Sequence, residues 1–167
     1  PTLAAQEGPK FVFAHILAPH SPFVFDKDGD LVNRRTPFAL DSDPEGYDWY
    51  SYSDAYYNEL LYVHERMLEV VEGILAKSET PPVIIIQGDH GIPRTASRGA
   101  HFEIYNAFYI GGEEVQELYD TISPVNSFRV VFNQVFNTRY PLLPDESFSY
   151  DEEKQVFDAF EGQFTCP

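Results

Sequence analysis

Residues 83–91 read VIIIQGDHG, in which four β-branched apolar residues run into a turn that contains two glycines. β-Branched side chains favour extended backbone, and a short continuous apolar run is typical of a strand covered on both faces. In parallel α/β sheets, ligands gather at the carboxyl ends of strands. The stretch therefore predicts a buried strand over residues 83–86, with Asp89 and His90 presented at its end.

The segments before this strand predict a helix and a further strand. Apolar residues fall at helical spacing over residues 54–77, with Asp54 early and Lys77 late, as the helix dipole favours. Residues 11–17 read FVFAHIL and stop short of Pro19, as a second buried strand would. The order strand, loop, helix, strand is that of a parallel α/β unit. We therefore expect an α/β fold with a mostly parallel sheet and flanking helices.

The remaining segments predict smaller elements. A strand is expected over residues 104–110, and a helix is expected to begin with Ser123 as N-cap and Pro124 as its first residue. One face of that helix is lined by Val125, Phe128, Phe132, Val135 and Phe136. Residues 23–48 lack any sustained period and predict a long loop, and residues 141–167 predict an irregular tail with a short helix near residues 152–160.

Length and charge exclude several classes of protein. The 167 residues fit one compact domain, so we expect a single domain over residues 1–167. The chain has 11 Lys and Arg residues against 27 Asp and Glu residues, a net charge of −16, which repels nucleic acid. Cys166 is the only cysteine, so an intrachain disulfide and a four-cysteine zinc site are excluded.

Asp89 and His90 are the first candidates for chemistry. A carboxylate oxygen and an imidazole nitrogen side by side suit Zn²⁺ or Mn²⁺, although a Gly-rich turn with a capping aspartate fits the same residues. His20 follows residues 11–17, so a parallel sheet would place it at the same edge as His90; the alternative is an exposed loop histidine. His15 and His64 are expected to be core or boundary histidines.

The loop over residues 92–101 brings in three more candidates. It is too short and irregular for a crossover helix, so it favours an antiparallel return that leaves His101 near His90. Arg94 is one of few cations in an acidic chain and could bind an anionic substrate, with surface pairing to carboxylates as the alternative. Thr95 and Ser97 are the hydroxyl groups nearest to Asp89 in this loop.

Several of these features occur in the same order in a known family. The His-x-Pro sequence at residues 20–22, the long helix and IIIQGDHG at residues 84–91 resemble the C-terminal half of sulfatase-like proteins of the alkaline phosphatase superfamily. Bacterial membrane-anchored members have stretches similar to YNAFY, SPVNSFR and LLPD, which begin here at residues 105, 123 and 142. The resemblance covers residues 10–149.

The resemblance implies a partial alkaline-phosphatase-like (sulfatase) fold and assigns roles to the candidates. Asp89 and His90 are implied to be ligands of a catalytic divalent metal ion, which could be Zn, Mn, Mg or Ca. His20 is similar to the histidine that contacts the phosphate or sulfate of the substrate or a second metal ion. His101 falls near another catalytic histidine of the related phosphotransferases.

The family's nucleophile and a further acidic ligand lie in its N-terminal half, and no residue here matches them. We therefore expect the C-terminal part of a longer protein that is anchored at the extracytoplasmic face of a bacterial membrane. Its expected function is to contribute metal ligands and a substrate-contacting histidine to a hydrolase or phosphotransferase of sulfate or phosphate esters, with negligible turnover without the N-terminal half.

Two alternatives are open. The chain could be a non-catalytic sulfatase-like domain whose acidic surface binds a basic partner. It could also be a hydrolase that is complete within these residues, with Thr95 or Ser97 as nucleophile, although neither lies on a strand-to-helix elbow.

Overall fold

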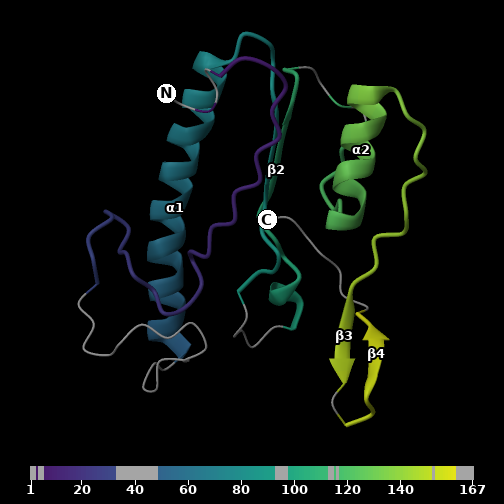
Figure 1. The fold of residues 1–167 in the computed structure, drawn as a ribbon. Coiled ribbons are helices and arrows are strands. Elements are labelled where there is room, and N and C mark those ends of the chain that lie inside the picture. Colours follow the sequence, from purple (N-terminus) through teal and green to yellow (C-terminus); the bar gives the residue numbers. More distant parts are fainter. Residues whose placement is uncertain are drawn as a thin grey trace. The chain divides into compact units, whose positions relative to one another are not determined.

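The computed structural model describes residue 3 and residues 6–32, 49–92, 98–112, 115, 117–151 and 153–160. The chain divides into two compact units, Pro1–Glu79 and Thr80–Pro167. Figure 1 shows helices and antiparallel strands in the chain, so the mixture of helix and strand expected from the sequence is confirmed. Among the described residues, no helix combines the length and apolar character needed to cross a membrane.

The first unit is built on α1, Trp49–Lys77, a helix of 29 residues that confirms the predicted one and extends it by one turn at its start. The core of this unit lies where residues 23–25 pack against α1. Phe23 packs edge-on against Tyr52 with ring centroids 5.0 Å apart. The carboxylate of Glu59, which is 1% exposed, accepts hydrogen bonds from the main-chain N–H groups of Val24 and Phe25. A buried glutamate therefore anchors this part of the predicted loop to α1.

The turn after this anchor is closed by Asp26. Its carboxylate accepts hydrogen bonds from the N–H groups of Asp28 and Asp30, at 3.0 and 2.9 Å. Phe25 and Leu31 form an isolated antiparallel bridge across the turn. Residues 33–48, the rest of the predicted loop, lie outside the described residues.

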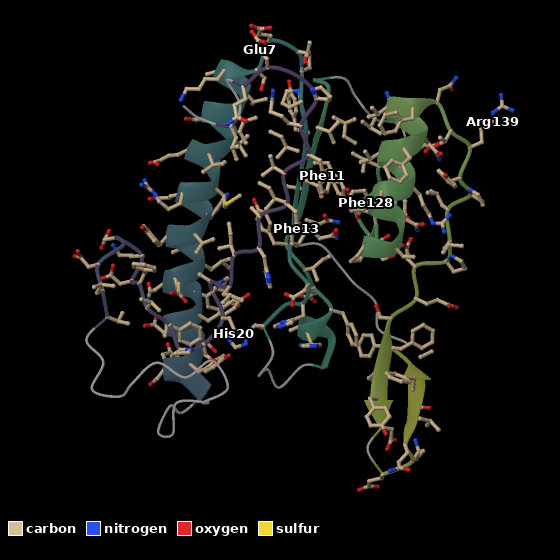
Figure 2. The ribbon with its side chains drawn as sticks, viewed as in Figure 1. Glu7, Phe11, Phe13, His20, Phe128 and Arg139 are labelled. Carbon is tan, nitrogen blue, oxygen red and sulfur yellow. The ribbon has the colours of Figure 1, made fainter. Side chains whose placement is uncertain are left out.

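Residues 11–17 do not form the predicted strand in this structure. All seven side chains are exposed, Phe11 at 84% and Phe13 at 80%, and Figure 2 shows both rings projecting from extended chain. A strand is stable only when a neighbour pairs with its main chain, and no described strand pairs with these residues. His15 in this segment and His64 in α1 are exposed, so the prediction of core or boundary histidines was wrong.

The second unit carries β1, Val83–Gln87, and β2, Asn106–Ile110, which pair antiparallel with Ile85 opposite Phe108. Both strands were predicted, but the mostly parallel sheet is not seen, because each of the two sheets among the described residues is a two-stranded antiparallel ladder. Among the described residues of the β1–β2 connection, the regular element is a 3-10 turn, Arg98–His101. A connection of this length is too short for the crossover that parallel neighbours need, in keeping with the antiparallel pairing.

Helix α2, Pro124–Phe136, follows with Pro124 in its first turn and Ser123 as N-cap, as predicted. The face expected to be apolar is exposed, and Figure 2 shows Phe128 on it. The buried residues of α2 are Asn126, Ser127, Val130 and Val131.

The buried face of α2 holds the chain segment that follows the helix. Asn126, which is 0% exposed, bonds both the N–H and the C=O of Leu143, at 2.9 and 2.8 Å. Asn133 makes the same pair of contacts with Tyr140, at 2.8 and 3.0 Å. Two asparagine side chains thus replace the main-chain partners that this extended segment lacks.

The tail differs from the prediction. A hairpin of β3, Phe148–Asp151, and β4, Val156–Ala159, stands where a helix over residues 152–160 was expected. The carboxylate of Asp151 accepts hydrogen bonds from the N–H groups of Glu153 and Lys154, which closes the turn. Residues 161–167, with Cys166, lie outside the described residues.

Candidate functional site

The candidate site lies at the carboxyl end of β1. The ladder ends as the N–H of Gly88 donates to the C=O of Tyr105 at 2.8 Å. Asp89 and His90 occupy the bend that follows, with side chains 91% and 35% exposed. The β-branched run therefore delivers a carboxylate to solvent and an imidazole to a half-covered position, as the sequence predicted.

Gly91 closes the loop over residues 92–101. Its N–H donates to the C=O of His101 at 2.7 Å. A Cβ atom at this position would lie 2.1 Å from the Ala100 oxygen and 2.5 Å from the Glu103 oxygen, both main-chain atoms. Only glycine allows this close approach of two backbone segments. The approach fixes residue 101 beside residue 90.

The rings of His90 and His101 are consequently stacked, with centroids 4.9 Å apart and planes inclined by 18°. The prediction that the loop returns His101 to His90 is confirmed. Burial, followed by the charge that the His90 ring can carry, lowers the pKa of His101 below its ordinary value, and the Asp89 carboxylate offsets part of this effect. His101 is therefore held neutral to lower pH than a free histidine, which is the form that binds a metal ion.

Hydrogen bonds to the main chain orient His90. Its Nδ1–H donates to the C=O of Gly91 at 2.6 Å, so the lone pair of the neutral ring lies on Nε2. Nε2 is 4.0 Å from Oδ2 of Asp89. Histidine ligands of metals ordinarily donate their second ring N–H to a carbonyl or carboxylate in this way. The tautomer and orientation of His90 thus suit a metal ligand.

His20 has the same arrangement in the first unit. Its Nδ1–H donates to the C=O of Ser21 at 2.5 Å, and its own N–H donates to Leu17 at 2.8 Å. The ring is exposed, with Nε2 available to a substrate or metal ion. His20 and His90 belong to different units of the chain, so their predicted closeness stays a prediction.

The other predicted contacts cannot be placed. Arg94, Thr95 and Ser97 lie outside the described residues. Within the described ranges, no group of three or more His, Cys, Asp and Glu side chains is arranged to hold a metal ion. Asp89 and His90 are therefore a pair of candidate ligands among the described residues, without a third beside them.

Sequence reasoning missed a pair of amide side chains beside the site. Gln87 and Asn106 are opposite each other in the β1–β2 register, so their side chains share one face of the sheet. Nε2 of Gln87 and Oδ1 of Asn106 are both buried, and neither has a hydrogen-bond partner in the part of the chain that the structure describes. Only the register of the two strands could have revealed this pair, because the residues are far apart in the sequence.

No family model, no curated protein sequence and no solved structure matches the chain. The interpretation of the site therefore depends on its own residues.

Proposed function

We propose that the chain supplies part of the active site of a metal-dependent hydrolase or phosphotransferase of sulfuric or phosphoric esters. Asp89 and His90 bind a divalent metal ion in this proposal. The main support for this proposal is the orientation of His90. Its Nδ1–H is bonded to the Gly91 carbonyl, so Nε2 remains available for a metal ion beside the solvent-exposed carboxylate of Asp89. A bound Zn²⁺, Mn²⁺, Mg²⁺ or Ca²⁺ would neutralise the negative charge that grows on the ester oxygens during displacement at phosphorus or sulfur.

The remaining candidates act on the substrate. In its imidazolium form, His20 donates the Nε2 proton to the leaving oxygen, while the Nδ1–H bond to the Ser21 carbonyl fixes the orientation of the ring. His101 stacks on the face of the His90 ring and places a second imidazole beside it. Arg94 binds the anionic ester oxygens.

Other parts of the site are proposed to come from an N-terminal half of the same protein. These are the nucleophilic hydroxyl, another acidic metal ligand and the membrane anchor that holds the enzyme at the extracytoplasmic face. In the intact protein, residues 11–17 are proposed to form a strand of a mostly parallel sheet, which gives their exposed apolar side chains a partner. Two ligands rarely hold a divalent ion tightly, so the 167 residues alone bind metal weakly and turn over no ester at a measurable rate.

Metal titration of the 167-residue chain tests the proposal. We expect Zn²⁺ to shift the NMR signals of the His90 ring and the Asp89 carboxyl group first, with weak affinity. The double variant Asp89→Asn, His90→Gln should lose these shifts. The matched control Glu103→Gln, His64→Gln, which likewise removes one carboxylate and one imidazole, should retain them.

Activity of the longer protein separates the enzyme from the interaction domain. Asp89→Asn with His90→Ala abolishes ester cleavage by the enzyme. Unchanged biological function in that double variant would instead favour a non-catalytic domain whose acidic surface binds a basic partner, in line with the net charge of −16. Tight stoichiometric zinc binding and robust phosphodiesterase activity of the 167 residues would contradict the proposal of an incomplete site.

A further inference from the structure

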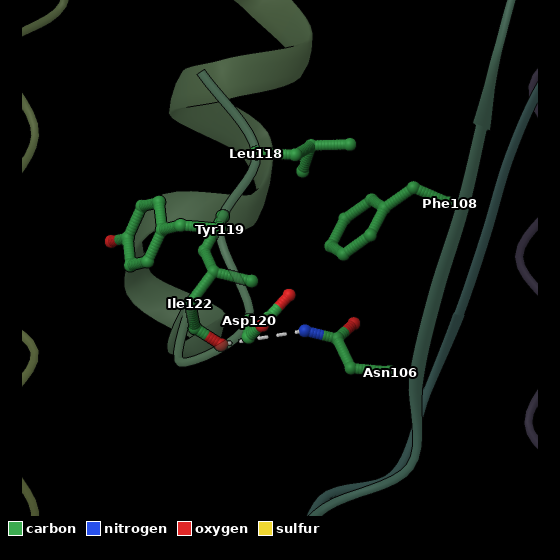
Figure 3. A pocket seen from close by; sticks show the side chains of 6 residues that line it. All are labelled: Asn106, Phe108, Leu118, Tyr119, Asp120 and Ile122. Atoms are coloured by element: carbon green, nitrogen blue, oxygen red, sulfur yellow. Dashed lines mark hydrogen bonds between the residues drawn. The ribbon is translucent and has the colours of Figure 1, made fainter. Parts of the chain in front are cut away.

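A second candidate binding site lies within the Thr80–Pro167 unit, on the face of β2 that carries Phe108. It is a cavity of about 320 Å³ between β2 and the turn that leads into α2. Figure 3 shows the side chains around it, which are Asn106, Phe108, Leu118, Tyr119, Asp120 and Ile122. None of these residues belongs to the candidate metal site.

The cavity has an apolar wall. Figure 3 shows the Phe108 ring and the Leu118 side chain facing each other across the space, with Ile122 alongside. An apolar cavity of about 150 Å³ is enough to bind benzene. The cavity in this unit therefore has room for a ring with a short polar extension, and ligand sites are typically apolar with a few polar groups placed at one end.

The polar end carries two oxygen acceptors, on Asn106 and Asp120, for which the described residues supply no donor. Oδ1 of Asn106 is buried without a partner, while Nδ2 of the same amide donates weakly to the Ile122 carbonyl at 3.5 Å. The Asp120 carboxylate is exposed and makes no hydrogen bond or ion pair with any described residue, and Figure 3 shows it beside the Asn106 amide. The Tyr119 hydroxyl does not contribute, because it donates to Asp145.

We propose that this cavity binds a small organic primary ammonium ion with an apolar ring or chain. The apolar part packs between Phe108 and Leu118, and the ammonium group donates to the Asp120 carboxylate and to Oδ1 of Asn106. An ammonium group has three donors and no acceptor, which matches two oxygens that lack a donor among the described residues. The net charge of −16 attracts such a cation to the protein over longer distances.

Other small ligands fit this end of the cavity less well. An anion would be repelled by the Asp120 carboxylate. A neutral apolar molecule would cover the Asn106 oxygen and the carboxylate without giving either a donor, which is unfavourable for buried polar groups. The cavity therefore selects an ammonium ion over anions and neutral molecules by its charge and by its number of hydrogen-bond donors. The contacts with Phe108 and Leu118 add affinity for any apolar ring.

The experiment follows benzylamine, protonated at neutral pH, by ¹H–¹⁵N correlation spectra of the full 167-residue chain. We expect saturable shifts at Asn106, Phe108 and Asp120. Asp120→Asn should weaken binding by about tenfold or more, since it removes the charged acceptor and keeps the shape. The control Glu153→Gln makes the same change in net charge on the β3–β4 turn and should leave the affinity unchanged.

Two further measurements test the parts of the proposal separately. Benzyl alcohol has the same ring without the charge and should bind at least about tenfold more weakly than benzylamine. Phe108→Leu should weaken both compounds. Equal affinity for the two compounds, equal effects of Asp120→Asn and Glu153→Gln, or shifts that never saturate would each overturn the proposal. None of these results depends on metal binding at Asp89 and His90.

Discussion

Replacement of Asn126 by alanine should destabilise the second unit strongly. The side chain is fully buried and holds the segment that follows α2 through two hydrogen bonds to the main chain of Leu143. Its Nδ2 group also lies 3.0 Å from the Tyr119 hydroxyl and 3.1 Å from Oδ1 of Asp145. A hydrogen bond contributes about 1 kcal/mol net, so we expect a loss of about 3 kcal/mol in the free energy of unfolding.

The neighbouring residue provides the control for this variant. Ser127 is equally buried, but its hydroxyl has no hydrogen-bond partner among the described residues. Ser127→Ala removes an unsatisfied oxygen and should change the free energy of unfolding by less than about 0.5 kcal/mol or stabilise the protein. Urea denaturation followed by circular dichroism measures both variants, and hydrogen exchange of the Leu143 amide reports the lost bond directly. Equal costs for the two substitutions, or unchanged exchange at Leu143 in Asn126→Ala, would refute the argument.

Two further predictions concern other buried or hydrogen-bonded carboxylates. Glu59→Ala leaves the N–H groups of Val24 and Phe25 without their acceptor, whereas Glu59→Gln keeps an acceptor oxygen. In urea denaturation the alanine variant should be less stable than the glutamine variant by about 2 kcal/mol. Equal stability of the two variants would show that these bonds matter little. Burial alone would raise the pKa of the Asp145 carboxyl, but hydrogen bonds from Ser123, Tyr119 and Asn126 outweigh it and hold that pKa below its ordinary value. The unfolded chain therefore binds a proton at this group first, so its stabilising effect is present above the ordinary pKa and is lost as the pH falls through the folded value. The stability difference between wild type and Asp145→Asn should accordingly shrink in acid, and a difference that stays constant from neutral pH to pH 2 would contradict this account.

Local patterns were sufficient to predict the main elements. The β-branched run over residues 83–86, the helical spacing before Lys77 and the proline at position 124 each act within a few residues of the element that they predict. These signals do not depend on distant parts of the chain. The end of α1 and the bounds of β1 agree with the sequence analysis to within one residue, whereas α1 begins five residues before the predicted start and β2 two residues after it.

The hairpin of β3 and β4 could not be predicted in the same way. Its turn lacks the Asn-Gly or Asp-Gly pair that usually indicates a hairpin, and it uses Gln155 at a positive φ of 54°. The residues around it, including Glu153 and Lys154, favour helices in isolation. The pairing of Tyr150 with Phe157 across the ladder overrides that local preference.

The candidate site was predictable only in part. The adjacency of Asp89 and His90 is a property of the sequence, and the short connection to β2 indicated that His101 returns to them. The clearance around Gly91 depends on main-chain atoms of residues 100 and 103, which no local pattern reports. The acceptor pair of Asn106 and Asp120 likewise arises from the packing of the turn against β2.

The contact at Gly91 also determines how the site can be dissected experimentally. A main-chain hydrogen bond from Gly91 to His101 holds the two ends of this loop together, so we expect the backbone to keep its path when the imidazole at position 90 or the carboxylate at position 89 is exchanged. Activity lost in those variants then reports on reactivity and not on misfolding. A larger residue at position 91 should instead displace the His90 and His101 rings while both side chains are still present, so activity lost in that variant would report on the position of these groups.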